Sequence, residues 1–286
     1  MKPVNRVAIL PNLRKSGVVR LLQEAVSWLE SRGMEVVTTG EAAGQISRPD
    51  LEVDPGEWWR HADMVLSLGG DGTVLSAAGL VSKHPIPVLG VNLGSLGFLT
   101  DVGEAELYST LERLMKGEYE IERRMALQAA VMREGKEVGR SYALNDVVVA
   151  TGAFSRVITL TTWVSGHEVS EYQADGIIIA TPTGSTAYSL ASGGPVVHPG
   201  VETILIAPIC AHTLGVRPVI VSAQETVTIE FSSDVGNVML TADGQRGFDL
   251  KPGDRIVVHK AARGARLVRT SKASFYNRLR TKLRWV

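Results

Sequence analysis

A short loop rich in glycine offers backbone amides and one carboxylate to a ligand. Residues 69–73 read Gly-Gly-Asp-Gly-Thr, directly after an apolar run that predicts a buried strand and before a helical segment. Glycines let backbone N–H groups approach a ligand closely, and a helix N-terminus attracts phosphate. The charge of Asp71 would repel phosphate, so this side chain suits a hydroxyl or a metal ion better. In the alternative interpretation, Asp71 simply caps the helix.

A second loop carries hydroxyl groups at most of its positions. Residues 181–189 read TPTGSTAYS and follow an apolar strand expected at 177–180. Hydroxyls and first-turn amides could hold a ribose, an adenine edge or a phosphate. An ordinary capped helix start explains the same pattern equally well.

A third segment places Asn145 and Asp146 at the head of an apolar strand, but this pair is common turn material and indicates no site by itself.

Several other kinds of chemistry find no support in the sequence. It contains no G-x-x-x-x-G-K-[ST] loop, no G-x-G-x-x-G fingerprint and no G-x-S-x-G elbow. The six histidines show no metal-ligand spacing, so we expect no metal site built from protein residues. Thirty basic and thirty acidic residues give a formal net charge of zero. We therefore expect no overall field that recruits nucleic acid or a membrane.

The elements that must position these loops change in character near residue 120. Before it, strand and helix patterns alternate, and the strands are mostly continuous apolar runs, which favours a parallel sheet covered on both faces. Apolar spacing predicts a helix over 18–30, with Gly33 as a left-handed cap. After Tyr119, alternating strands such as 226–231 and frequent turn signals predict a second, mostly antiparallel domain.

Length and composition agree with a globular protein of two domains. The 286 residues correspond to about two domains at roughly 150 residues each. An apolar content of 44% and a charged content of 21% exclude a disordered chain. The one cysteine, Cys210, cannot form an internal disulfide, and its apolar surroundings predict that it is buried. No signal peptide or apolar run of 18 residues occurs, so we expect a soluble cytoplasmic protein.

Taken together, four segments resemble the NAD kinase family (ATP-NAD kinases). They are GGDGT at 69–73, LNDVVV at 144–149, DGIIIATPTGSTAYSLASGGPVVHP at 175–199 and ADGQ at 242–245. GGDGT is shared with phosphofructokinases and diacylglycerol-type lipid kinases, whereas the long third segment is specific. The resemblance implies an α/β nucleotide-binding domain at 1–118 and a β-rich NAD-binding domain at 119–272. It also implies that the tail at 273–286, with a helix expected from Ser274 to Leu283, returns to the first domain.

The resemblance also implies an activity: phosphorylation of the adenosine 2′-hydroxyl of NAD to give NADP, with ATP and a divalent metal ion, usually Mg²⁺. Asp71 matches the family's proposed proton acceptor, and the family suggests a homodimer or homotetramer. The implied nucleotide-binding positions are Gly69, Gly70, Asp71, Gly72, Thr73, Asn145, Asp146, Arg156, Gln173, Asp175, Thr183, Thr186, Ala187, Tyr188, Ser189, Leu190, Ala191 and Gln245.

Two positions depart from the family pattern. Many members carry a basic residue where Gly79 stands, and many carry Arg or Lys where Gln173 stands. Two other functions compete with NAD phosphorylation: a GGDGT-type kinase that acts on a sugar or lipid, and a nucleotide-binding sensor without catalysis. The specific segment at 175–199 argues against the first, and Asp71 argues against the second.

Overall fold

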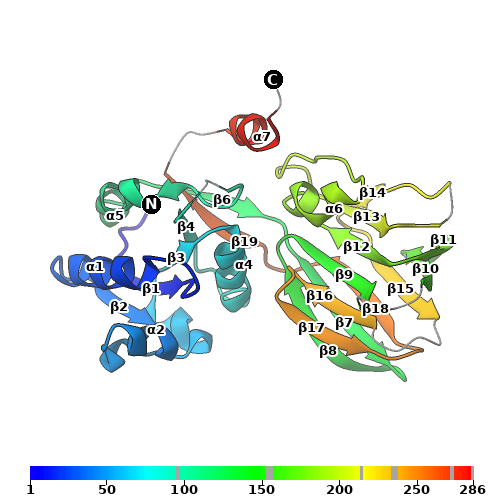
Figure 1. The fold of residues 1–286 in the computed structure, drawn as a ribbon, viewed down its shortest axis with the longest axis horizontal. Coiled ribbons are helices and arrows are strands. Elements are labelled where there is room, and N and C mark those ends of the chain that lie inside the picture. The colour runs from blue at the N-terminus through cyan, green and yellow to red at the C-terminus, as the bar shows by residue number, and fades with distance from the viewer. Residues whose placement is uncertain (95–96, 153–156, 213–214, 233–237, 271–273, 285–286) are drawn as a thin grey trace. The chain divides into compact units, whose positions relative to one another are not determined.

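A computed structural model of the chain describes residues 1–94, 97–152, 157–212, 215–232, 238–270 and 274–284. Two compact units are visible in Figure 1: Met1–Arg123 together with Ala265–Val286, and Arg124–Gly264. The first unit therefore includes residues 119–123 and 265–272, which the sequence had assigned to the second domain. The reason is that strands β6 (Glu120–Arg124) and β19 (Ala265–Arg269) belong to the sheet of the first unit.

The first unit is built on one seven-stranded sheet, in the order β2-β1-β3-β4-β19-β6 with β5 paired to β4. All of its strand pairs for which a register is given are parallel. The central strands β3 and β4 are buried along their whole length, as a sheet covered on both faces requires. The remaining strands of this sheet are β1 (Arg6–Pro11), β2 (Glu35–Thr38), β3 (Met64–Gly69), β4 (Val88–Asn92) and β5 (Val102–Gly103).

Helices cover both faces of this sheet (Figure 1). The predicted helix at 18–30 is confirmed as α1 (Val18–Glu30), and Gly33 has the expected left-handed conformation, with φ of 76°. The buried residues of α1 and α5 share one core cluster with the strands, whereas α4 packs on β3 and β4. The other helices are α2 (Gly40–Gln45), α3 (Trp58–His61), α4 (Asp71–Leu80), α5 (Leu107–Met115) and α7 (Phe275–Leu283), with 3₁₀ turns at Pro49–Leu51, Pro55–Glu57 and Glu104–Glu106.

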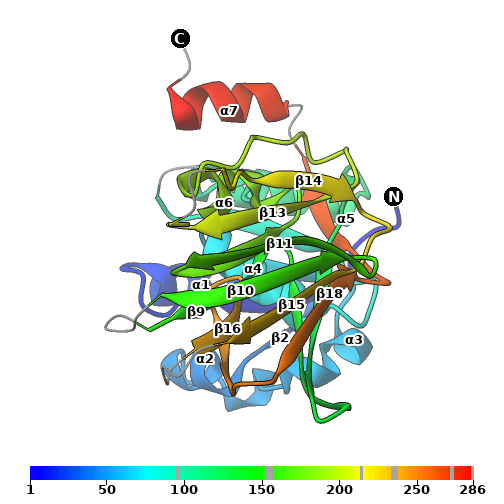
Figure 2. The same ribbon diagram turned by 90° about the vertical axis from the view of Figure 1, so that its right-hand side faces the viewer.

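The second unit consists of two six-stranded sheets, and every strand pair in them is antiparallel. One sheet has the order β11-β10-β15-β18-β7-β8, of which Figure 2 shows β10, β15 and β18 side by side. The other has the order β14-β13-β12-β9-β16-β17. The first sheet comprises β7 (Leu127–Arg133), β8 (Lys136–Ala143), β10 (Ile158–Val164), β11 (His167–Ala174), β15 (Val227–Ser232) and β18 (Arg255–Lys260).

The second of these sheets is covered on both faces near its centre. Its inner face shares one core cluster with the other sheet, and its outer face forms a second, smaller cluster that includes Val148, Ile178 and Leu205. This explains why its central strands are continuous apolar runs, whereas β15 alternates buried and half-buried residues as predicted. The strands are β9 (Asp146–Thr151), β12 (Gly176–Ala180), β13 (Thr203–Ile209), β14 (Val219–Ser222), β16 (Val238–Ala242) and β17 (Arg246–Leu250), and α6 (Tyr188–Ala191) follows a 3₁₀ turn at Gly184–Thr186.

The predicted fold class, a parallel α/β domain followed by an antiparallel β-rich domain, is therefore confirmed. The prediction for Cys210 is wrong. This residue lies one position beyond the end of β13, has a φ of 49° and is exposed, because the strand ends before it. In the part of the chain that the structure describes, no helix is both long and apolar enough to span a bilayer.

Candidate functional site

The glycine-rich loop of the first unit is the turn from β3 into α4. Strand β3 ends at Gly69, Gly70 is the extended residue before the helix, and Asp71 is the first helical residue. Gly69 is required by packing, because a Cβ there would lie 2.2 Å from Thr73 Oγ1. The structure thus places the five predicted residues 69–73 at one end of a buried strand, where a helix N-terminus also points.

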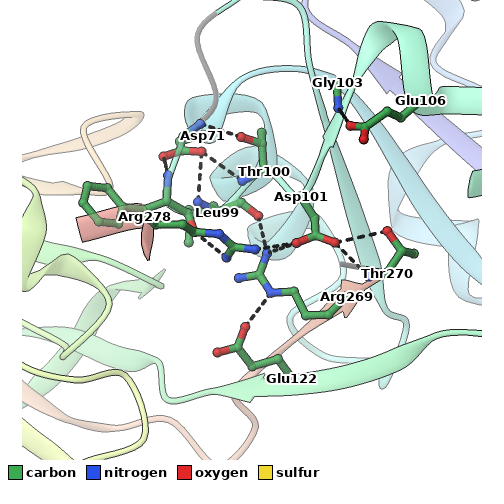
Figure 3. Close-up of polar contacts among 12 residues, drawn as sticks. Asp71, Leu99, Thr100, Asp101, Gly103, Glu106, Glu122, Arg269, Thr270 and Arg278 are labelled. Carbon is green, nitrogen blue, oxygen red and sulfur yellow. Dashed lines mark hydrogen bonds and ion pairs between the residues drawn. The ribbon is translucent and has the colours of Figure 1, made fainter. Parts of the chain in front are cut away.

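The carboxylate of Asp71 binds a neighbouring loop (Figure 3). Oδ2 accepts a hydrogen bond from the N–H of Phe98 at 2.7 Å, and Oδ1 accepts from the N–H groups of Leu99 and Thr100 at 3.0 and 3.1 Å. The alternative role of Asp71 as the helix cap is therefore wrong: Gly70 occupies that position, and no side chain caps the helix. A carboxylate has about four lone-pair sites, so three occupied sites leave about one for a substrate hydroxyl.

Gly97 makes this close approach possible. A Cβ on Gly97 would lie 1.9 Å from Asp71 Oδ1, and its three nearest neighbours are all atoms of that carboxylate. The same loop is closed by a hydrogen bond from the N–H of Gly97 to Thr100 Oγ1 at 2.8 Å. This loop was not among the predicted site segments, although the closely spaced Gly94 and Gly97 are a visible signal in the sequence.

The second unit brings three of the recognised segments to one end of its second sheet. Asp146 at the start of β9 is paired with Ala180 at the end of β12, and Val147 is paired with Ala242 at the end of β16. The loops that continue from these strand ends are 144–145, 181–187 and 243–245. Segments almost a hundred residues apart in the chain therefore meet because neighbouring antiparallel strands end at the same edge.

Asp243 fixes the backbone of the Asn145–Asp146 corner. Its carboxylate accepts hydrogen bonds from the N–H groups of Leu144, Asn145 and Asp146 at 2.9, 2.7 and 3.2 Å. The N–H of Asp243 in turn donates to the carbonyl of Asp146 at 2.9 Å. Asp243 itself has a φ of 52°, which is in the left-handed region that Asp tolerates better than most residues.

Two buried carboxylates, those of Asp146 and Asp243, lie close enough at this corner for the charge of one to disfavour ionisation of the other. Burial, and to a smaller extent the nearby negative charge of Asp243, raises the pKa of Asp146 to about 7. Burial also raises the pKa of Asp243, but its three backbone N–H donors oppose that shift. Because these donors favour the charged form of Asp243, we assign the retained proton to Asp146. Asp146 therefore titrates near neutral pH.

The hydroxyl-rich turn packs directly against the same corner. The N–H of Thr181 donates to the carbonyl of Asn145 at 2.8 Å, and its hydroxyl donates to the carbonyl of Leu144 at 2.6 Å. A Cβ on Gly184 would lie 2.1 Å from the carbonyl oxygen of Asn145, so only glycine allows this approach. The hydroxyl of Ser185 is also used internally, since it donates to the carbonyl of Pro182 at 2.7 Å.

Other hydroxyls of this turn are less committed to the fold. Thr183 is 6% exposed, and its Oγ1 accepts a hydrogen bond from the guanidinium of Arg124 at 3.2 Å. Arg124 is itself only 4% exposed and was not among the predicted site residues, although two adjacent arginines, Arg123 and Arg124, stand at this point in the sequence. The buried Oγ of Ser189 finds no hydrogen-bond partner among the described residues.

The remaining predicted positions lie in different places. Gln173 and Asp175 are exposed, and Gln173 lies on β11 of the other sheet. Asp175 directly precedes β12 and is five positions from Ala180, the partner of Asp146, which corresponds to about 17 Å at about 3.4 Å per residue. The structure therefore does not bring these two into the cluster at 144–146. Tyr188, Ala191 and Gln245 are exposed, Thr186, Ala187 and Leu190 are half-buried, and Arg156 lies outside the described residues.

Metal ligands do not gather in either unit. Over the described ranges, no three His, Cys, Asp or Glu side chains lie together as a protein metal site would require.

Comparison with known proteins identifies the family. Residues 7–119 match the ATP-NAD kinase N-terminal domain, and residues 144–270 match the ATP-NAD kinase C-terminal domain. The chain belongs to the NAD kinase family. It is 43% identical over 288 residues to the NAD kinase of Geotalea daltonii and 43% identical over 282 residues to that of Geobacter sulfurreducens, with 99% of each chain covered in both cases.

Solved structures of NAD kinases have the same fold. A yeast NADH kinase complexed with NADH superposes with a TM-score of 0.92 at 25% identity, covering 100% of this chain and 89% of the other. An NAD kinase from Archaeoglobus fulgidus in complex with ATP gives a TM-score of 0.75 at 26% identity, covering 98% and 99%.

Replacing Gly97 tests whether the position of the Asp71 carboxylate matters. We expect Gly97→Ala to displace the carboxylate, because the three atoms nearest to the new methyl group all belong to the Asp71 carboxylate. NADP formation should fall at least about tenfold, since small misplacements of catalytic groups carry large rate costs. Steady-state kinetics and thermal unfolding would be measured side by side.

The matched control is Gly94→Ala in the same loop, where a Cβ meets Lys15 Nζ at an ordinary 3.5 Å. This variant should retain wild-type turnover. Full activity of Gly97→Ala would show that the observed carboxylate position is irrelevant to turnover.

The raised pKa of Asp146 predicts a pH dependence of stability. Between its unfolded pKa near 3.9 and its folded pKa near 7, the folded state binds more protons, so the free energy of unfolding falls as the pH rises. Asp146→Asn should remove about 2–3 kcal/mol of that fall between pH 5 and 8. Urea unfolding at several pH values would measure it. Asp249→Asn, an exposed carboxylate on β17, should keep the wild-type profile; an unchanged profile for Asp146→Asn would contradict the assignment.

Proposed function

We propose that this chain phosphorylates the adenosine 2′-hydroxyl of NAD, with ATP as donor, to form NADP. The observation that carries the proposal is the Asp71 carboxylate, held by three backbone amides at the head of α4, in a member of the NAD kinase family. The structural relatives include one solved with NADH and one solved with ATP. One of these ligands is the proposed donor, and the other is the reduced form of the proposed acceptor.

Asp71 acts as the proton acceptor in this proposal. The 2′-hydroxyl oxygen attacks the γ-phosphorus of ATP, its proton passes to Asp71, and the bond from the γ-phosphorus to the bridging oxygen breaks to release ADP. An alcohol is a weak nucleophile, and a positioned carboxylate orients it and takes its proton. Otherwise, phosphoryl transfer depends mainly on positioning and on neutralising charge. Backbone amides of residues 69–73 are suited to both tasks.

Residues of the second unit are proposed to bind the NAD ribose and its neighbours. Asp146 and Asn145 offer a carboxylate and an amide at a corner that Asp243 keeps rigid. A carboxylate can accept from two ribose hydroxyls at once. The buried Oγ of Ser189 supports a ligand role, because buried polar atoms normally have partners. The roles of Arg156, Gln173, Asp175 and Gln245 stay predictions.

Mg²⁺ is proposed to arrive with ATP. This ion usually keeps several waters and binds through substrate phosphates, and the described residues offer no three-ligand cluster. When bound, it would neutralise phosphate charge.

We further propose that the protein is a cytoplasmic homo-oligomer. The lone cysteine suits a reducing compartment. The edge strand β14 exposes Val219 and Ile220, which are available for pairing with a second copy.

One assay separates this function from its alternatives. The protein is incubated with MgATP and NAD, and NADP is detected with an NADP-specific dehydrogenase. Parallel reactions replace ATP by inorganic polyphosphate, or NAD by NADH, a sugar or a diacylglycerol. ATP consumption only with a sugar or lipid would establish the competing kinase, and NAD binding without NADP from any donor would establish the sensor.

Asp71→Asn tests the proposed chemistry. The amide cannot take a proton, so kcat should fall about 10²–10⁴-fold, as is typical when a general base is lost. Binding of NAD, measured by calorimetry, should change little, because the variant keeps the size and shape of the side chain. Wild-type turnover in Asp71→Asn would remove this residue from the mechanism.

Gly72→Ala tests the approach of the ligand to the loop. Among the described residues, no atom lies within 4 Å of a Cβ placed on Gly72, so the fold does not need glycine there. We expect unchanged thermal stability and a KM for NAD that rises about tenfold, because the methyl group blocks the ligand. Gly79→Ala on the same helix is the control, because a Cβ placed there also meets nothing within 4 Å, and it should leave KM unchanged. Equal effects of both substitutions would contradict a ligand at Gly72.

A further inference from the structure

The loop that holds Asp71 is itself held by the C-terminal part of the chain (Figure 3). Asp101, whose side chain is fully buried, is at the centre of this contact. Its Oδ1 forms an ion pair with Arg278 of α7 and lies 3.6 Å from Arg269 of β19. Its Oδ2 accepts hydrogen bonds from the N–H and hydroxyl of Thr270 at 2.7 and 3.1 Å.

Both arginines also bind the backbone of the loop. Arg278 Nη1 donates to the carbonyl of Phe98 at 3.3 Å, and Arg269 Nη1 donates to the carbonyl of Leu99 at 3.0 Å. The N–H groups of these same two residues donate to Asp71. Phe98 and Leu99 therefore form hydrogen bonds in two directions. Their carbonyls accept from the C-terminal arginines, and their N–H groups donate to the Asp71 carboxylate.

The two positive and two negative groups of this cluster balance in charge, but removing them from water costs desolvation free energy. Two guanidinium groups face the carboxylates of Asp101 and Glu122, the latter accepting from Arg269 Nε at 2.5 Å. Arg269 and Arg278 are 9% and 7% exposed. Burial, together with the charge of Arg269, lowers the pKa of Arg278. Buried ion pairs of this kind add little stability compared with apolar packing, so we interpret them as groups that specify the geometry of the loop.

We propose that Arg278 is a positioning residue for Asp71: by binding Asp101 and the Phe98 carbonyl together, it sets the loop whose amides orient the proton acceptor. This inference rests on the proposed function for its kinetic consequence. Arg278 is too buried to be a surface ligand for a nucleotide phosphate, and its guanidinium is engaged by groups of its own unit. It acts through the loop rather than on the substrate.

Two substitutions of Arg278 test the kinetic consequence. Arg278→Lys keeps the charge but loses the planar fork that reaches two acceptors, and Arg278→Gln removes the charge. We expect kcat to fall about ten- to a hundredfold in both, with KM for NAD within about twofold of wild type, because a misplaced base slows chemistry more than binding. Arg280→Gln is the control, since Arg280 is exposed on the same helix and should show wild-type kcat.

A double-mutant cycle distinguishes positioning from a general structural effect. In the Asp71→Asn background, Arg278→Lys should cause no further loss of the residual single-turnover rate, because there is no acceptor left to position. An equal loss in both backgrounds, or a raised KM with unchanged kcat, would overturn the proposal. Thermal unfolding of every variant shows whether it is folded.

A spectroscopic measurement gives an answer that does not depend on turnover. The chain has five phenylalanines, so selective ¹⁵N-phenylalanine labelling yields few amide signals, and Asp71→Asn identifies that of Phe98 through its lost acceptor. Arg278→Lys should shift the same signal, and Arg280→Gln should not. An unshifted Phe98 signal would overturn the inference. Absence of NADP in the wild-type assay would instead reject the proposed function, which keeps the two failures distinct.

Discussion

The first unit depends on one contact, in which three consecutive backbone amides at 98–100 bind the carboxylate of Asp71. The loop that supplies the amides is open to this contact only because Gly97 has no side chain. It keeps its shape because Asp101 ties it to Arg269 and Arg278. A charged group at a helix start is thus fixed by backbone dipoles, which cannot change rotamer as side chains can.

In the second unit, three consecutive backbone amides also bind one carboxylate, but there the carboxylate fixes the backbone. Asp243 accepts from the three consecutive amides at 144–146, just as Asp71 accepts from those at 98–100. Here the carboxylate of Asp243 fixes the backbone at 144–146, and this segment carries Asn145 and Asp146, the residues proposed to bind the ligand. Burial, with the nearby charge of Asp243 as the smaller cause, also raises the pKa of Asp146 to about 7. The two units therefore orient polar groups by backbone hydrogen bonds rather than by contacts among exposed side chains.

Much of the fold could be predicted from the sequence because the patterns involved are local. The helix at 18–30 follows from apolar spacing within thirteen residues, and the residues that produce this spacing are buried: Val18, Leu21, Leu22, Ala25, Val26 and Leu29. The strand-to-helix turn at Gly70 follows from adjacent glycines after an apolar run. By contrast, the exposure of Cys210 depends on where β13 stops, and the unit boundary depends on β6 and β19 joining the first sheet. Strand partners far away in the chain leave no such local pattern.

The sequence by itself determined the fold class, the family and the presence of Asp71 in a glycine-rich turn, since each is encoded by neighbouring residues. Only the tertiary structure decided what holds that carboxylate. Arg278 and Asp101 are separated by 177 positions, and Asp243 and Asp146 by 97. Nothing in the residues around an arginine indicates which distant carboxylate it will meet. Their contact arises only when sheet pairing and burial bring these distant parts of the chain together.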